Sequence, residues 1–213
     1  MNISRDSVLD WLKACASILE ESRDYLTELD SAIGDADHGA NMDRGFKAVL
    51  SKLPEVVAKD IGSIFKTTGM ALVSTVGGAA GPLYGTFFLQ AGVVAAGKTE
   101  LAPGDWVASL DAGVKGVINR GKAGPGDKTM LDALLPALEA ARAALAGGKT
   151  LEQVLSESAA AARKGAEDTI PIVARRGRAS YLGERSAGHR DPGATSASMI
   201  LTAAADVFGK AKG

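Results

Sequence analysis

Apolar residues recur along most of the chain at steps of three, four or seven, the spacing of one face of an α-helix. One series follows Ser4, a good N-cap residue, and spans 8–29, which predicts a single long helix. A second series spans 42–53 and ends at a proline. The polar, glycine-bearing segment 30–39 between them is therefore expected to form a loop.

The same helical rhythm continues to the end of the chain. We expect a third helix from Ile61, a fourth after Pro82, and others at about 103–120, 129–147, 150–167 and 193–209. Thr150 and Gln153 have the spacing of a capping box. Strand signals are almost absent, since only 5% of residues are aromatic and alanine-rich windows favour helix. The pattern predicts an all-α, single-domain bundle of about eight antiparallel helices over residues 1–213.

Composition narrows the possible functions. With 213 residues, 46% of them apolar, the chain can bury one sizeable core. A net charge of −1 gives no general attraction to nucleic acid or to an anionic membrane, so any anion site must be local. The lone Cys15 and an N-terminus without an apolar signal core suggest the cytoplasm. The uncharged run 67–97 could span a membrane, but its glycines and Pro82 favour two buried half-segments.

The sharpest chemical signal is a cluster of three carboxylates, Asp30, Asp35 and Asp37, within eight residues. Close carboxylates repel one another unless a cation lies between them, and magnesium prefers oxygen ligands. An EF-hand is excluded, because glycine and phenylalanine occupy two of its ligand positions. The other interpretation is a solvated loop in which Asp30 and Asp37 cap helices.

Three more segments could bind anions. The small-residue turn 75–85 could present backbone N–H groups to a phosphate, or it could let helices pack closely. Segment 121–129 fails the P-loop pattern, and the simplest alternative is a loop whose Asp127 or Thr129 caps the next helix. The long connection 175–190 carries five arginines, which suits an anion site or a partner surface, although it could be merely solvated.

Taken together and in order, segments 33–42, 77–85, 121–130 and 177–195 resemble the ADP-binding L subunits of phosphotransferase-system-dependent dihydroxyacetone kinases. That family is related to the C-terminal domain of the ATP-dependent enzymes, and the resemblance covers nearly the whole chain. It implies a barrel of eight antiparallel helices with the nucleotide bound by interhelical loops at one end.

Residue by residue, the resemblance assigns two Mg²⁺ ions to Asp30, Asp35 and Asp37, and a catalytic charge to Arg178. One departure from the family is Ala80, where relatives commonly carry serine, so only its backbone N–H is available. The resemblance assigns ADP contacts to His38, Gly39, Ala40, Asn41, Ala79, Ala80, Gly121, Met130, Arg178, Asp191, Pro192 and Gly193.

The activity implied is relayed phosphoryl transfer. Bound ADP would act as a coenzyme that takes a phosphoryl group from a phosphohistidine carrier, the M subunit, and passes it to dihydroxyacetone on a separate K subunit. Two other classes stay open: a magnesium-dependent phosphohydrolase or ATP-using ketose kinase, and a non-enzymatic barrel that binds a lipid or a partner helix. The sequence leaves open the phosphoryl donor, the ketose and the oligomeric state.

Overall fold

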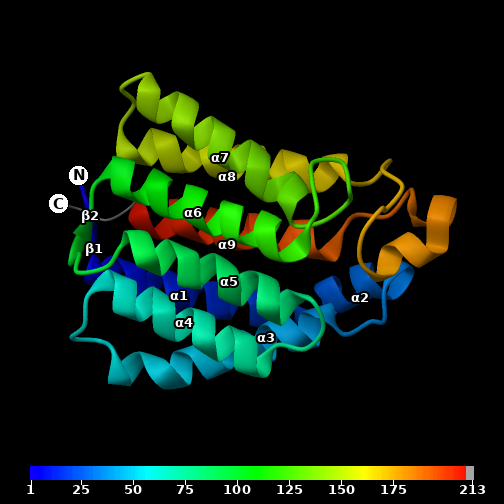
Figure 1. The fold of residues 1–213 in the computed structure, drawn as a ribbon, viewed down its shortest axis with the longest axis horizontal. Helices are drawn as coiled ribbons and strands as arrows, with labels where there is room; N and C mark the ends of the chain where they lie inside the picture. The colour runs from blue at the N-terminus through cyan, green and yellow to red at the C-terminus, as the bar shows by residue number, and fades with distance from the viewer. Residues whose placement is uncertain (210–213) are drawn as a thin grey trace.

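The computed structural model describes residues 1–209 and is built almost entirely of helices (Figure 1). Two 3-10 helices, η1 (Leu53–Glu55) and η2 (Arg178–Ser186), and an antiparallel pair of two-residue strands, β1 (Ile3–Ser4) and β2 (Glu100–Leu101), complete the described elements. The α-helices are α1 (Arg5–Glu21), α2 (Arg23–Ile33), α3 (His38–Lys52), α4 (Ile61–Thr75), α5 (Ala80–Val94), α6 (Pro103–Gly121), α7 (Leu131–Ala146), α8 (Leu151–Asp168) and α9 (Pro192–Phe208).

Eight of these helices form a closed ring in which each packs against the next in the order α1, α3, α4, α5, α6, α7, α8, α9, and α9 returns to α1. Neighbours run antiparallel, and α2 stands beside the ring at the end opposite the β1–β2 pair (Figure 1). The predicted all-α antiparallel barrel is confirmed. Because directions alternate, every second helix begins at the same end.

Several predicted helix starts are confirmed by their hydrogen bonds. The Ser4 hydroxyl accepts from the Ser7 N–H at 3.1 Å. Thr150 and Gln153 form the expected capping box, in which each side chain accepts from the other residue's N–H. Such caps satisfy backbone donors that have no partner inside the helix.

The predicted single helix over 8–29 is wrong, because the chain breaks at Ser22 between α1 and α2. Ser22 has φ −93° and ψ 6°, and its ψ lies outside the range of an α-helix. Its N–H still donates to Ile18 O, so Ser22 is the only residue that separates α1 from α2. Leu19 and Leu26 on either side are both fully buried. The apolar period of seven therefore continues across the break and hides it.

The expectation that all three aspartates lie on a loop over 30–39 also needs correction. Asp30 belongs to the last turn of α2, and α3 begins at His38, so the loop consists only of residues 34–37. The apolar pattern missed the start of α3 because its first turn, His38–Asn41, contains no large apolar residue. A helix thus holds one carboxylate while a tight turn brings the other two to it.

The uncharged run 67–97 forms α4 and α5, which meet at a turn, as expected for two buried half-segments. Glycines set their spacing: a Cβ on Gly85 would lie 2.8 Å from Gly69 O, and one on Gly92 would lie 2.9 Å from Gly62 O. Close packing of small residues is therefore the right interpretation for part of this run. Over residues 1–209 no helix combines the length and apolarity that crossing a membrane requires.

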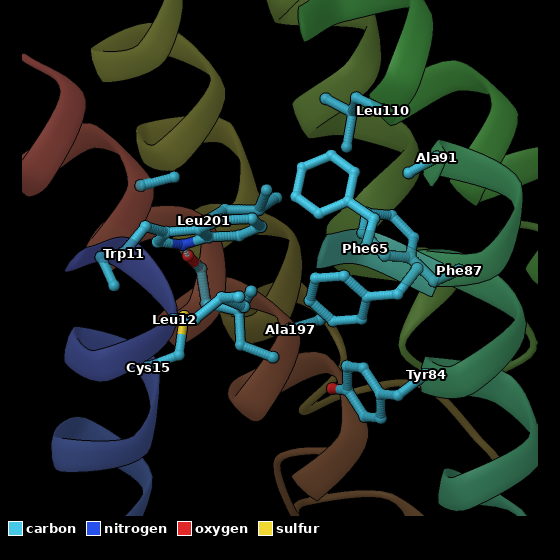
Figure 2. Close-up of a cluster of buried hydrophobic side chains, with 14 of the residues drawn as sticks. Trp11, Leu12, Cys15, Phe65, Tyr84, Phe87, Ala91, Leu110, Ala197 and Leu201 are labelled. Carbon is cyan, nitrogen blue, oxygen red and sulfur yellow. Dashed lines mark hydrogen bonds between the residues drawn. The ribbon is translucent and has the colours of Figure 1, made fainter. Parts of the chain in front are cut away.

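Aromatic rings fill the centre of the barrel (Figure 2). Trp11 of α1 contacts four of them at centroid distances of 5.5 to 6.1 Å, and its Nε1–H donates to Ile200 O at 3.0 Å. The rings that it contacts are Phe65, Phe88, Trp106 and Phe208. One indole thus links helices from both halves of the chain.

We expect Trp11→Ala to lower the free energy of unfolding by about 3 to 5 kcal/mol, because it opens a cavity and removes the hydrogen bond from the indole to Ile200 O. Urea unfolding followed by far-UV circular dichroism measures this change. Val93→Ala, at a side chain that is 69% exposed, is the control and should change stability by less than about 0.5 kcal/mol. A loss below about 1 kcal/mol for Trp11→Ala would contradict the central role of this ring.

Candidate functional site

The connections at the α2 end of the barrel surround a cavity of about 190 Å³. Lining residues come from the α2–α3, α4–α5 and α6–α7 connections and from the long segment between α8 and α9. Of the predicted site residues, those that line it are Asp30, Asp35, Asp37, His38, Asn41, Ala79, Ala80, Met130, Arg178, Asp191, Pro192 and Gly193. Segments more than 160 residues apart in the sequence thus meet around one space.

Gly39, Ala40 and Gly121 do not line this cavity. Gly39 lets the start of α3 approach α2, since a Cβ there would lie 1.9 Å from Arg23 O. Gly121 is the last residue of α6, where a Cβ would lie 3.1 Å from a Leu83 methyl group. Packing therefore requires glycine at position 39, whereas a Cβ at position 121 would need only a small shift of the Leu83 side chain. The ligand contacts of both glycines stay a prediction.

The three aspartates form a compact oxygen cluster. One carboxylate oxygen from each of Asp30, Asp35 and Asp37 lies within 4.8 Å of the others. Asp30 is buried, and its Oδ2 accepts from the N–H groups of Asp37 at 2.9 Å and His38 at 3.2 Å. Asp30 therefore also holds the loop in place through these two backbone bonds. The interpretation of Asp30 as a helix cap did not include this role.

The backbone of this loop is specialised for close approach. A Cβ on Gly34 would lie 2.0 Å from Asp30 Oδ1, so no other residue fits there without moving the carboxylate. Ala36 has φ +61°, a left-handed conformation that only glycine adopts at low cost. Strain of this kind persists where the surrounding structure imposes it, often at functional sites. The aspartates are thus held together despite their repulsion.

This donor set fits a hard divalent cation. Carboxylate oxygens are what Mg²⁺ prefers, and no sulfur or imidazole nitrogen belongs to the cluster of Asp30, Asp35 and Asp37. A positive side chain is also present, since Arg178 Nη2 lies 3.0 Å from Asp35 Oδ2. Arg178 begins η2, with its side chain 65% exposed. The negative charge of the carboxylates can therefore be offset by a metal ion between them and by the exposed guanidinium of Arg178.

Helix starts add positive potential. Helices α3, α5, α7 and α9 all begin at this end, so the positive ends of their dipoles lie beside the cavity. The start of α5 at Ala80 has no side-chain cap, and Gly78 with φ +63° turns the chain into it. Residues 77–80 line the cavity, so phosphate binding by the backbone of the small-residue turn stays a prediction for this part of it.

A buried polar chain crosses the floor of the cavity. His38 Nε2 and Ser196 Oγ are 2.8 Å apart, and Ser196 Oγ is 2.7 Å from the Tyr84 hydroxyl, which donates to Gly193 O at 3.1 Å. Burial lowers the pKa of His38, against the opposing effect of Asp30 and Asp37. This shift favours the neutral form of the imidazole, and the contact with Ser196 fixes the orientation of the ring. Sequence reasoning missed Tyr84 and Ser196, which have no motif of their own.

Segment 121–130 is a loop whose backbone is fixed by several side-chain hydrogen bonds. Asp132, in the first turn of α7, accepts from Thr129 N–H at 2.7 Å and from Gly126 N–H. The predicted cap Asp127 instead accepts from Gly124 N–H inside the same turn, whereas Thr129 Oγ1 accepts from Leu131 N–H at 3.2 Å. Sequence reasoning also missed Lys128, which is 1% exposed and lines the cavity.

The arginine-rich connection is not structureless, since residues 178–186 form η2. Arg190 reaches Glu167 at 3.3 Å, while Arg185 is exposed. In the same segment Tyr181 is 88% exposed, the most accessible large apolar side chain in the described part of the protein. The segment thus combines an inward contact from Arg178 to Asp35 with an outward surface suited to a partner.

Asp191 caps α9 as predicted, accepting from Ala194 N–H at 2.7 Å. Burial raises the pKa of its carboxyl group to about 7, with added repulsion from Asp132 and Asp30. The folded protein therefore keeps a proton that the unfolded chain releases near pH 4. It follows that the contribution of this group to stability is lost as pH rises from about 4 to about 7.

We expect Asp191→Asn, which keeps a good N-cap residue, to remove this part of the pH dependence. Urea unfolding of both proteins in EDTA at pH 4.5 and 7.5 tests it. The free energy of unfolding of the wild type, relative to the variant, should fall between the two pH values. Parallel pH profiles would show that Asp191 does not titrate in this range.

Comparisons with known proteins agree with this geometry. A family model described as the DAK2 domain matches residues 32–206. The ADP-binding subunit DhaL of a PEP-dependent dihydroxyacetone kinase from Escherichia coli is 47% identical over 201 residues, which cover 94% of this chain and 96% of that protein. The ADP-binding subunit DhaL of a PTS-dependent dihydroxyacetone kinase from Lactococcus lactis is 39% identical over 92% of this chain and 94% of that protein.

A solved structure is also similar. The dihydroxyacetone kinase of C. freundii in complex with AMP-PNP and Mg²⁺ aligns with a TM-score of 0.69 and 28% sequence identity. The alignment covers 92% of this chain but 33% of that protein, so this chain spans about a third of the larger kinase.

Proposed function

The chain belongs to the DAK2 domain family, and we propose that it is the ADP-binding subunit of a phosphotransferase-dependent dihydroxyacetone kinase. Bound nucleotide receives a phosphoryl group and passes it to dihydroxyacetone. One observation carries the proposal: a carboxylate cluster, an uncapped helix start and an arginine face the same cavity. Phosphoryl transfer depends mainly on positioning and charge neutralisation, and these are the groups that supply both.

Asp30, Asp35 and Asp37 are proposed to hold magnesium through their carboxylate oxygens. When bound, the metal offsets the charge of the phosphate oxygens and fixes their positions. One oxygen of each carboxylate lies within 4.8 Å of the others, close enough for the three to share a metal site. The proposed number of ions is two, as the family resemblance implies.

The protein groups around the metal have distinct proposed roles. Backbone N–H groups at Ala79 and Ala80 bind phosphate oxygens at the start of α5. His38 and Met130, which line the cavity, contact the rest of the nucleotide. Arg178 offsets charge on the phosphoryl group in transit. Further proposed contacts come from Gly39, Ala40, Asn41, Gly121, Asp191, Pro192 and Gly193.

The proposed partners are the K subunit, which holds dihydroxyacetone, and a phosphohistidine carrier, the M subunit. The exposed Tyr181 and Arg185 beside Arg178 support docking at this end of the barrel. Reacting atoms must approach within about 3 to 3.5 Å, so the K subunit has to cover the cavity mouth.

The proposed compartment is the cytoplasm, consistent with a single free, buried cysteine. The proposed nucleotide-binding domain is the whole chain 1–213.

We expect Asp35→Ala and Asp37→Ala to abolish retention of Mg-ADP, because each removes a metal ligand. Arg178→Ala should retain ADP but slow transfer by roughly 10² to 10³, since its charge acts mainly in the transition state. Nucleotide content after gel filtration and single-turnover transfer measure the two effects. The matched control is Asp10→Ala, at an exposed carboxylate on α1. Equal loss of ADP in all three site variants would make Arg178 a binding residue only.

Activity should require three components. The isolated subunit should not phosphorylate dihydroxyacetone, whereas addition of a K subunit and a phosphorylated histidine carrier should give turnover with catalytic amounts of ADP. A coupled assay for dihydroxyacetone phosphate measures this. Sustained turnover with free ATP and no carrier would instead identify an ATP-dependent ketose kinase with the same nucleotide site.

Docking can be tested on the same reconstituted system. Arg185→Glu should weaken binding of the K subunit more than retention of ADP, because Arg185 is exposed on η2, the element that begins with Arg178. Lys13→Glu on α1 makes the same change in charge and should leave binding unaltered. Equal affinities of the two variants for the K subunit, measured by calorimetry, would exclude this surface.

A further inference from the structure

Lys128 is a buried lysine surrounded by main-chain oxygen. Its side chain extends from the α6–α7 connection into the segment between α8 and α9, where the ammonium meets five backbone carbonyl groups. The acceptors are the carbonyl oxygens of Thr169 at 2.8 Å, Ile170 at 3.4 Å, Ile172 at 3.0 Å, Ser186 at 2.8 Å and His189 at 2.5 Å.

The cage favours a cation in its centre. Five carbonyl dipoles direct their negative ends at one nitrogen, and an ammonium has three N–H donors but no acceptor. Burial lowers the pKa of Lys128, while Asp191 and Asp132 act in the opposite direction. Within residues 1–209 the ammonium forms no ion pair, so carbonyl dipoles provide its contacts. The arrangement is that of a monovalent cation in an oxygen cage.

The five carbonyls come from the two ends of one connection. Residues 169–172 directly follow α8, and residues 186–189 precede α9, so the ammonium joins both ends. Other bonds close the same loop: Gly188 N–H donates to Ile170 O at 2.7 Å, and Asp191 N–H donates to Thr169 Oγ1 at 2.9 Å. The segment that this closure encloses carries Arg178.

We propose that Lys128 is a positioning residue that acts as a tethered monovalent cation and locks the 169–191 connection over the cavity. The lock sets the place of Arg178 against Asp35 and of Asp191 at the start of α9. The effect on phosphoryl transfer rests on the proposed function, whereas the effect on the order of the connection does not. Shortening the side chain leaves an oxygen cage that K⁺ or NH₄⁺ can enter.

Trypsin measures the order of the connection directly, because it cleaves after the arginines at 175, 176, 178 and 185. In tetramethylammonium chloride, whose cation is too large for the cage, Lys128→Ala should be cut there roughly ten times faster than the wild type through local opening. Replacing this salt by potassium or ammonium chloride at the same ionic strength should restore most of the protection. The wild type should not respond to the exchange.

Two variants serve as controls. Lys122→Ala changes an exposed lysine in the same connection that also has a left-handed backbone, with φ +50° against +63° at Lys128, so backbone strain is matched. It should behave as the wild type in every salt. Lys128→Met fills the cage without a charge, so it should be cut faster and should not respond to small cations. If Lys128 only filled space, small cations would not restore the protection of Lys128→Ala from trypsin. Protection restored in Lys128→Ala but not in Lys128→Met therefore indicates a role for the positive charge.

Three results would overturn the proposal. Lys128→Ala could resist trypsin as well as the wild type in tetramethylammonium chloride, its fast cleavage could be reduced by no small cation, or the variant could stay unfolded in every salt.

A second measurement separates this proposal from the proposed function. Single-turnover transfer by Lys128→Ala should recover with K⁺ or NH₄⁺ in parallel with tryptic protection. Protection without any transfer, in the variant and the wild type alike, would reject the kinase proposal and leave the tethered cation intact.

Discussion

Antiparallel closure of the helical ring is the constraint on which the site depends. Because each helix reverses the direction of its neighbour, α3, α5, α7 and α9 must all begin at one end, and their partial positive charges add there. At the same end, Asp30 sits in the last turn of α2, where a carboxylate is unfavourable next to the negative end of a helix. The N–H groups that Asp30 accepts from, and the cation that it fits, resolve this conflict.

Helix starts at the two ends of the barrel differ in part. At the β1–β2 end, the N-cap side chains Ser4, Asp60 and Thr150 cap α1, α4 and α8, whereas the N-cap residue of α6, Ala102, has no such side chain. At the cavity end, Asp191 caps α9, but the N-cap residues of α3, α5 and α7 make no such bond. A side-chain cap contributes about 1 kcal/mol, and α5 lacks this contribution where its first residues line the cavity.

Periodicity predicted the helices well because burial of an apolar stripe forms each of them, and capping chemistry located starts such as Ser4 and Asp191. The same reasoning missed the break at Ser22, since Leu19 and Leu26 keep the period across it. The site loops meet because of long-range packing, which a local sequence pattern does not encode. Only the family resemblance predicted that they lie at one end of the barrel. Lys128 stayed hidden because its partners are main-chain oxygens, which every residue possesses.

The small strand pair suggests a practical use. Helix α6 starts two residues after β2 and ends at the cavity end of the barrel, and its 19 residues span about 28 Å at 1.5 Å per residue. That length is nearly three Debye lengths in 0.1 M salt, each of about 10 Å. A surface anchor or charged fluorophore attached beside β1 would therefore leave the anion-binding end electrostatically undisturbed. Immobilised protein could then be titrated with nucleotide or partner subunits in its native charge environment.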